Sequence, residues 1–158
     1  MGDWVEPGKK APDFTLPADD GTQVRLSQLR GKPVVLYFYP RDDTPGCTRE
    51  ACAFRDRKEQ IAAQAVAVLG VSCDDVESHQ RFRDKYALNF RLLADVDHQV
   101  AEDYGAWREK VRFGKKSMGI QRSTFLIDAK GVVRKVWKSV EVDGHDEQVI
   151  QAIGEIPG

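Results

Sequence analysis

The chain has 158 residues, 41% of them hydrophobic, and its 24 lysines and arginines nearly balance its 25 aspartates and glutamates. This composition predicts one globular domain over residues 1–158. The net charge of −1, with both signs interspersed, argues against a nucleic-acid-binding protein and against attachment to an anionic membrane. No stretch approaches the ~18 apolar residues of a membrane span, and the N-terminus lacks the pattern of a secretory signal, so we expect a cytoplasmic protein.

Strand-like and helix-like segments alternate along the chain. A hairpin is expected first, with strands at Phe14–Leu16 and Gln23–Leu26 around a turn that ends in Asp-Gly. The apolar run Val34–Tyr39 is typical of a central strand buried on both faces. The later predicted elements are a helix (Thr48–Ala65), a strand (Ala65–Val71), a helix (Val76–Tyr86) started by Asp74 and Asp75, a strand (Arg91–Asp95), a helix (Asp97–Tyr104), a hairpin (Thr124–Asp128 and Val132–Trp137) and a helix (Glu147–Ile153).

This order of elements predicts an α/β fold with a mixed central sheet, helices on both faces and an N-terminal β-hairpin. Strands that alternate with helices are expected to pair in parallel, whereas the late hairpin adds antiparallel edge strands. The layout is that of the thioredoxin-like fold. Because a fold does not determine a function, the function has to be inferred from the site.

The most informative stretch, residues 39–52, joins the central strand to the next helix and places Cys47 at the helix start. There, unpaired backbone N–H groups and the helix dipole favour a thiolate. Lowering a thiol pKa by ~2.5 units takes roughly 3.4 kcal/mol, whereas a helix dipole supplies at most ~2 kcal/mol. A cation or further hydrogen bonds must therefore contribute. Arg122 is the best candidate, because it directly precedes a strand that could lie beside the central one.

Two prolines and a threonine set the geometry of this loop. Pro40 ends the strand, Pro45 suits a helix start, and the Thr44 hydroxyl can cap the helix or lie beside the sulfur. The simplest alternative is that the loop only caps a helix.

A second cysteine, Cys52, follows Cys47 by five residues. On an intact α-helix, residues five apart have Cα atoms ~8.6 Å apart, but a disulfide requires a distance below about 7 Å. If the two cysteines pair, the first turns of the helix must unwind.

The pattern Pro40-x-x-x-Thr44-x-x-Cys47 resembles the active-site motif of the peroxiredoxins. The fuller stretch from Tyr37 to Cys52 resembles the bacterioferritin-comigratory protein, or PrxQ, branch of that family. The resemblance covers about residues 8–153. Three further stretches match the same branch: Ala11–Leu16, Arg122–Asp128 and Val142–His145.

The resemblance implies a thiol peroxidase for hydrogen peroxide and organic hydroperoxides that needs no metal or other cofactor. Cys47 would attack the O–O bond and become a sulfenic acid, and Cys52 would resolve it as an intramolecular disulfide. Thr44 and Arg122 would hydrogen-bond the peroxide, and Pro40 would shield the sulfur. Thioredoxin or glutaredoxin would then reduce the disulfide, and the branch suggests a monomer or weak dimer.

Two other functions could use the same cysteines. A thiol-disulfide oxidoreductase usually has two residues between its cysteines, whereas four separate Cys47 from Cys52. A redox sensor, in which local unfolding around these cysteines exposes a docking surface, uses the same residues as the peroxidase. Because both functions use the same residues, the sequence gives little basis for distinguishing a redox sensor from a peroxidase.

The other candidate residues are expected to have structural roles and no part in catalysis. Cys73, after the second buried strand, is expected to be a passive, partly buried thiol. Asp42 and Asp43 are expected to cap a helix, and the basic segment 107–116 is expected to be a solvated loop beside the active site, in preference to a surface for RNA or a partner. The three histidines lack metal-ligand spacing with the cysteines and are expected at the surface or at helix starts: His79, His98 and His145.

Overall fold

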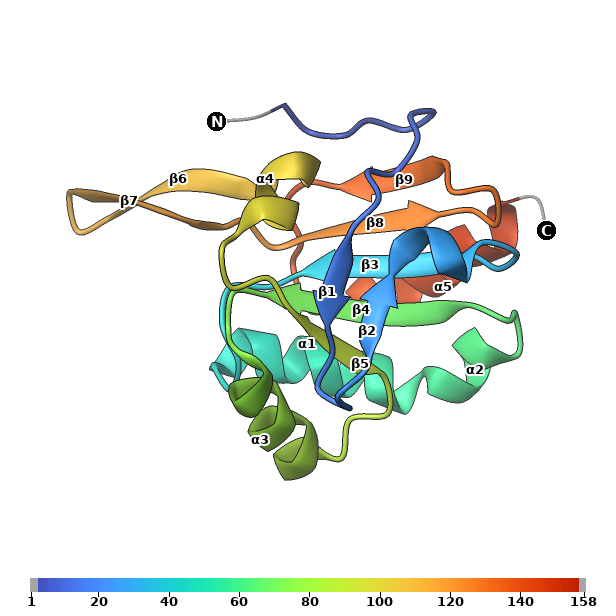
Figure 1. Cartoon of the computed structure of the whole chain (residues 1–158), viewed down its shortest axis with the longest axis horizontal. Coiled ribbons are helices and arrows are strands. Elements are labelled where there is room, and N and C mark those ends of the chain that lie inside the picture. Colours follow the sequence, from blue (N-terminus) through green and yellow to red (C-terminus); the bar gives the residue numbers. More distant parts are fainter. Residues whose placement is uncertain (1–2, 157–158) are drawn as a thin grey trace.

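The computed structural model describes residues 3–156 and is built around a five-stranded sheet (Figure 1). The strand order is β5-β4-β3-β8-β9, in which β3, β4 and β5 run parallel while β8 and β9 form antiparallel pairs. The predicted mixed sheet is therefore confirmed. The strands are β3 (Val34–Phe38), β4 (Ala67–Ser72), β5 (Arg91–Ala94), β8 (Ser123–Ile127) and β9 (Val133–Trp137).

Different elements cover the two faces of the sheet (Figure 1). Successive side chains of β3 point to opposite faces of the sheet. Val35 and Tyr37 therefore join one apolar core, and Leu36 and Phe38 join the other. The first core is closed by α1 (Pro45–Asp56), α2 (Lys58–Ala62), α3 (Val76–Tyr86) and α5 (His145–Glu155). The second is closed by the expected hairpin of β1 (Thr15–Pro17) and β2 (Gln23–Arg25), the 3₁₀ helix η1 (Leu26–Leu29) and α4 (Gln99–Tyr104). Within residues 3–156, no helix is long and apolar enough to cross a bilayer.

The predicted helix over Thr48–Ala65 is wrong as a single element. The chain leaves helical geometry at Arg57, where φ is −99° and ψ is 7°, and α2 begins at the next residue. The Arg57 guanidinium lies 3.0 Å from Asp146 and 2.6 Å from Glu147, both in the first turn of α5. These partners come from a distant part of the chain, so a local helical pattern does not reveal the break.

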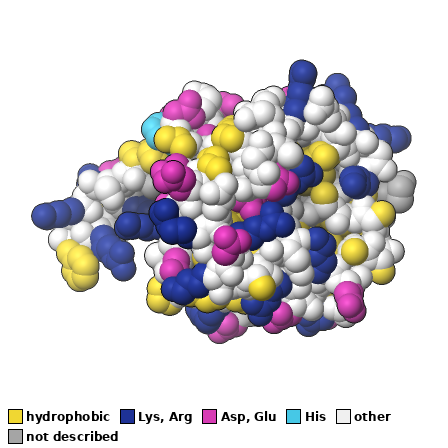
Figure 2. Space-filling model, turned by 60° about the horizontal axis from the view of Figure 1, so that its bottom comes forward, with side chains coloured by type: hydrophobic (Ala, Val, Ile, Leu, Met, Phe, Trp, Pro, Cys, Tyr) yellow, Lys and Arg dark blue, Asp and Glu magenta, His cyan; other side chains and the backbone are white. Residues whose placement is uncertain are grey.

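The expected solvated loop around residues 107–116 is also wrong. Residues 107–120 form an antiparallel hairpin of β6 (Trp107–Arg112) and β7 (Lys115–Ile120) that projects from the body of the molecule (Figure 1). Phe113 and Gly114, at its two-residue turn, have φ values of 53° and 74°. Positive φ at both central residues matches the twist of a tight hairpin. In Figure 2 this arm carries several lysine and arginine side chains and a hydrophobic tip, whereas the body shows mixed charge.

Candidate functional site

Cys47 lies where the central strand gives way to α1. Thr44 is the N-cap residue and Pro45 occupies the first position of the helix, so Cys47 falls in the first turn. The backbone N–H groups of this turn lack partners within the helix and favour a nearby negative charge. Cys47 is only 2% exposed. The structure thus places this sulfur, buried from solvent, at the expected helix start.

Arg122 supplies the cation nearest to this sulfur. It directly precedes β8, and the pairing of Ser123 with Phe38 brings it to the end of β3. Its Nη2 atom lies 3.3 Å from the Cys47 Sγ. Burial works against the charged guanidinium, but Glu50 and Cys47 together raise the pKa of Arg122. The structure thus places Arg122, the arginine that the sequence analysis favoured, in contact with the Cys47 sulfur.

Gly46 makes this approach possible. A Cβ atom at this position would lie 3.1 Å from Nη2 of Arg122, closer than most side-chain contacts. The absence of a side chain at residue 46 leaves room for the guanidinium above the helix start.

Glu50, which the sequence reasoning did not include, lies one turn below the sulfur and shares the same guanidinium. Its Oε1 atom lies 2.7 Å from Arg122 Nη1, and its Oε2 atom finds no hydrogen-bond partner within residues 3–156. Burial raises the pKa of Glu50 to about 7, against the lowering effect of Arg122. The carboxyl group of Glu50 and the sulfur of Cys47 therefore share one cation. The sequence signal for Glu50 was its spacing, three residues after Cys47 on the same helical face.

Thr44 and Pro40 complete the predicted set. The Thr44 hydroxyl donates a 2.9 Å hydrogen bond to the backbone carbonyl of Arg41. It accepts no hydrogen bond from the backbone N–H groups of the helix start, so the side-chain cap, one of its two expected roles, does not form. Pro40 is exposed and follows the end of the central strand. Both residues border the loop that leads to Cys47.

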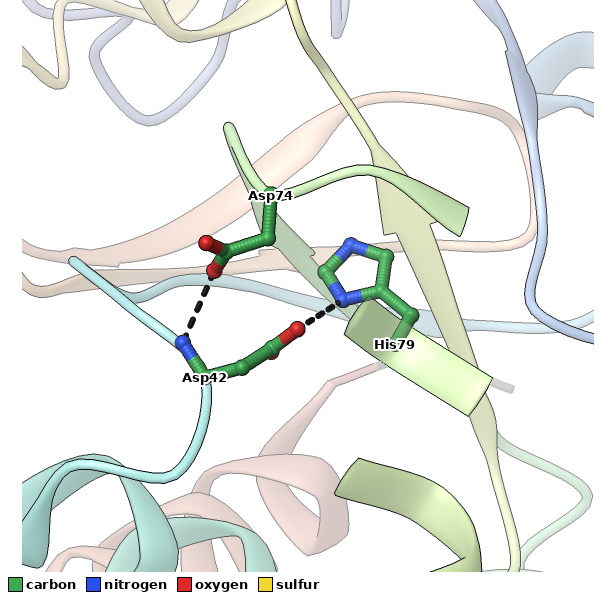
Figure 3. Close-up of side chains that lie close together, drawn as sticks. All are labelled: Asp42, Asp74 and His79. Atoms are coloured by element: carbon green, nitrogen blue, oxygen red, sulfur yellow. Dashed lines mark hydrogen bonds and ion pairs between the residues drawn. The ribbon is translucent and has the colours of Figure 1, made fainter. Parts of the chain in front are cut away.

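A buried polar network holds that loop in place (Figure 3). The Asp42 carboxylate accepts hydrogen bonds from the Tyr39 hydroxyl (2.5 Å) and the Ser78 hydroxyl (2.8 Å), and lies 2.7 Å from Nδ1 of His79. The backbone N–H of Asp42 donates to Asp74 at 2.8 Å. The prediction that Asp42 caps a helix is therefore wrong, because its carboxylate ties the loop to α3.

His79 is fully buried, contrary to the expected surface or helix-start position. Its Nε2 lies 2.9 Å from the Leu93 carbonyl, which can only accept, so this nitrogen carries a proton. Burial would lower the pKa of His79, but the bond to Asp42 raises it overall. The missed signal was its position three residues before Phe82 on the apolar stripe of α3.

The same residues also lie close enough to ligate a metal ion. The nearest donor atoms of Asp42, Asp74 and His79 all fall within 4.8 Å of one another. Both ring nitrogens of His79 already face hydrogen-bond acceptors, and both carboxylates accept hydrogen bonds from protein groups. The geometry therefore fits a structural hydrogen-bond network.

The other two cysteines lie in different surroundings. Cys52 is half-buried within the intact α1, and all three cysteines are free thiols. Cys73 follows β4, where burial and the charges of Asp95, Asp74 and Asp97 raise its pKa to about 12. Such a thiol is a poor nucleophile at neutral pH.

Known proteins resemble this chain in both sequence and fold. The model of the AhpC/TSA family matches residues 7–136. This chain belongs to the AhpC/TSA family. Its Bcp relative from Coxiella burnetii is 56% identical over 146 residues, which cover 92% of this chain and 97% of the relative. Peroxiredoxin Bcp of Bacillus subtilis is 47% identical over 152 residues, covering 96% and 97%. The chain is thus a peroxiredoxin of the Bcp/PrxQ type, an antioxidant thiol peroxidase.

Solved peroxiredoxin structures match the fold over nearly the whole chain. A cysteine-to-serine mutant of PrxQ from Xylella fastidiosa gives a TM-score of 0.91 at 32% identity, covering 97% of this chain and 98% of the other. The bacterioferritin comigratory protein of Xanthomonas campestris, described for its alkyl peroxide reduction activity, gives 0.87 at 34% identity and covers 98% of both chains. The predicted thioredoxin-like fold is confirmed.

Proposed function

We propose that this peroxiredoxin is a two-cysteine peroxidase in which Cys47 reacts with the peroxide and Cys52 resolves the product. The observation that carries the proposal is the 3.3 Å contact between the Arg122 guanidinium and the Cys47 sulfur at a helix start. The Cys47 thiolate attacks one peroxide oxygen, the O–O bond breaks, and a sulfenic acid and an alkoxide or hydroxide form. The leaving oxygen then takes up a proton.

Arg122 has two roles in this proposal. Its charge favours the thiolate before reaction, and its N–H groups face the region where negative charge develops on the leaving oxygen. The Thr44 hydroxyl, which now donates to the Arg41 carbonyl, would contribute a further hydrogen bond to the bound peroxide. Pro40 would limit the access of water to the sulfur.

Cys52 resolves the sulfenic acid by forming a disulfide with Cys47 and releasing water. Both residues belong to the intact α1, so resolution requires the first turns of this helix to unwind. Thioredoxin or glutaredoxin would return the disulfide to two thiols and become oxidised in turn. We infer a single domain over residues 1–158, active as a monomer or weak dimer in the cytoplasm.

We infer that hydrogen peroxide and small organic hydroperoxides are the substrates. Both carry the O–O bond that the Cys47 sulfur attacks. The Xanthomonas campestris protein, which is described for alkyl peroxide reduction, supports the organic class.

Rapid mixing of the reduced protein with hydrogen peroxide tests the roles of the cysteines. The wild type should oxidise rapidly and end in a Cys47–Cys52 disulfide by peptide mass spectrometry. The Cys52→Ser variant should consume one equivalent of peroxide at an unchanged rate but fail to turn over with thioredoxin. The Cys73→Ser variant is the matched control and should behave as the wild type.

Two results would contradict this assignment. A disulfide that contains Cys73 would remove Cys52 from the resolving role. Loss of the first oxidation in Cys52→Ser would instead indicate a dithiol exchanger, in which both cysteines are needed from the start.

A further inference from the structure

The β6–β7 hairpin concentrates positive charge in a chain that is otherwise acidic. Residues 107–120 contain five lysines and arginines and one glutamate, a net charge of +4, which leaves −5 for the remainder of the chain. The hairpin projects from the body beside α4 (Figure 1). Its charge is therefore displayed on an arm and is not balanced within the arm itself.

One face of the hairpin carries a row of cations, and the innermost of them, Lys110, is influenced by the charges of Arg122 and Cys47. The register pairs Lys110 with Ser117 and Arg112 with Lys115, so these side chains share a face. The Lys110 stem lies over Gly119, where a Cβ atom would come within 3.5 Å of it. Burial and the nearby charge of Arg122 lower the pKa of Lys110, whereas Cys47 raises it. Lys110 thus lies within electrostatic reach of the reactive sulfur, and Arg112 and Lys115 extend the positive charge outward to the tip.

The base of the hairpin is anchored, and apolar side chains are exposed farther along it. The Arg108 guanidinium lies over the ring of Trp4 and donates a hydrogen bond to the Gly105 carbonyl. Toward the tip, three apolar side chains are open to solvent: Val111 (66% exposed), Phe113 (94%) and Met118 (44%). Exposed aromatic and methionine side chains framed by cations are typical of protein-binding surfaces.

We propose that the β6–β7 hairpin is a docking arm for the acidic dithiol protein that reduces the Cys47–Cys52 disulfide. The proposal rests on the two-cysteine mechanism above, because that mechanism requires a protein reductant at this site. One thiolate of the partner attacks the disulfide to give a mixed disulfide, and its second thiolate releases the peroxiredoxin. Two electrons pass from the partner, which leaves as a disulfide.

A protein fits this arm better than a nucleic acid does. The second strand of the arm ends at Ile120, two residues before the arginine that contacts the Cys47 sulfur, and the turn of the hairpin exposes Phe113. The remainder of the chain carries −5, which repels a long phosphate backbone extending beyond the hairpin. A compact acidic protein can meet the cations and the tip while its dithiol reaches Cys47.

Reversal of the tip charges tests the proposal. The triple variant Arg112→Glu, Lys115→Glu, Lys116→Glu changes exposed residues outside the catalytic set. Its matched control, Lys9→Glu, Lys32→Glu, Lys130→Glu, changes the net charge equally through exposed lysines outside the arm. Lys32 and Lys130 flank the Val34 and Ile127 ends of β3 and β8, opposite the active-site end.

With an acidic thioredoxin as reductant, the KM for thioredoxin should rise at least about tenfold in the tip variant and change less than about twofold in the control. The turnover of both variants with dithiothreitol should equal that of the wild type. The wild-type KM for thioredoxin should rise with ionic strength, whereas that of the tip variant should not. The Phe113→Ser variant should raise the same KM independently of salt.

Each contrary result has a distinct meaning. Equal KM values for the two triple variants would overturn the docking arm, as would turnover with dithiothreitol but with no acidic thioredoxin or glutaredoxin. A hairpin-dependent shift of nucleic acid, or hairpin-dependent dimers in sedimentation, would assign the arm to another occupant and likewise overturn the proposal. Failure of the wild type to turn over with any thiol would instead overturn the proposed function.

Discussion

Cys47 and Cys73 lie at the same edge of the sheet but in opposite electrostatic surroundings. They follow β3 and β4, neighbouring parallel strands that end at the same edge of the sheet. Cys47 faces the Arg122 guanidinium and a helix start, whereas burial and, after it, three aspartates raise the pKa of Cys73 to about 12. The fold therefore brings both thiols to the edge where α/β proteins place active sites, and burial together with the neighbouring charges makes Cys73 a poor nucleophile.

Of the substitutions considered, removal of the Arg122 cation should have the largest effect on the oxidation rate of Cys47. Arg122→Met should slow the oxidation of Cys47 by roughly 10²-fold, because the loss of one donor to a developing oxyanion costs about that much. Arg122→Lys should recover part of the rate, since it restores charge without the two-pronged geometry. Stopped-flow oxidation by hydrogen peroxide measures both variants. Arg49→Met is the matched control, because this arginine of the same helix pairs with the exposed Asp143.

An unchanged rate in Arg122→Met would contradict the central role of this residue. The contrast between Cys47 and Cys73 would then have to come from the helix start alone.

The pH dependence of protein stability tests the raised pKa of Glu50, the carboxyl group beside Cys47. Its pKa in the folded protein, about 7, lies above the ordinary value of 4.5. The folded state therefore binds an extra proton, and this stability is fully present below pH 4.5 and lost as the pH rises through about 7. The wild type should lose up to about 3 kcal/mol of unfolding free energy over this range relative to Glu50→Gln.

Urea denaturation of the reduced proteins at pH 5 and pH 8 measures the Glu50 effect. The difference in stability between wild type and Glu50→Gln should be larger at pH 8, with the variant the more stable. A difference that does not change with pH would show that Arg122 keeps Glu50 ionised throughout.

The smallest expected effects concern the rate at which Cys73 is alkylated. At pH 7.5, iodoacetamide should alkylate Cys47 at least tenfold faster than Cys73 in the native protein, because burial and the nearby aspartates raise the pKa of Cys73 to about 12 and leave it almost entirely protonated. Asp97→Asn, which removes one of the three surrounding charges, should speed the alkylation of Cys73 only slightly. Peptide mass spectrometry at timed intervals follows both sites. Equal alkylation rates for Cys47 and Cys73 would contradict the comparison.

The sequence predicted the sheet well because its signals are local. The apolar run at Val34–Tyr39 and the alternation of strands and helices determine most of the central sheet. Thr44 and Pro45 correctly marked the start of α1, although the Thr44 side chain does not cap it. The chemical roles of Cys52, Thr44 and Pro40 remain predictions.

Two of the errors arise from partners that are distant in sequence. Arg57 ends α1 where it meets Asp146 and Glu147, and His79 is buried because Asp42 and the Leu93 carbonyl satisfy its ring. Local patterns carry little information about such distant contacts. The β6–β7 hairpin was missed for a local reason, because its strands are charged and its turn lacks the usual Asn-Gly or Asp-Gly pair.

The interruption at Arg57 also sets the size of the cooperative unit that can open. α1 ends at Asp56, while the ion pairs of Arg57 fix the start of the next segment to α5. Melting that begins at Cys47 would therefore stop within one short helix, leaving Ile61 and the apolar core beneath α2 closed to water. The protein could pass through each redox cycle by exposing only a small part of its interior, with little opportunity for aggregation or proteolysis.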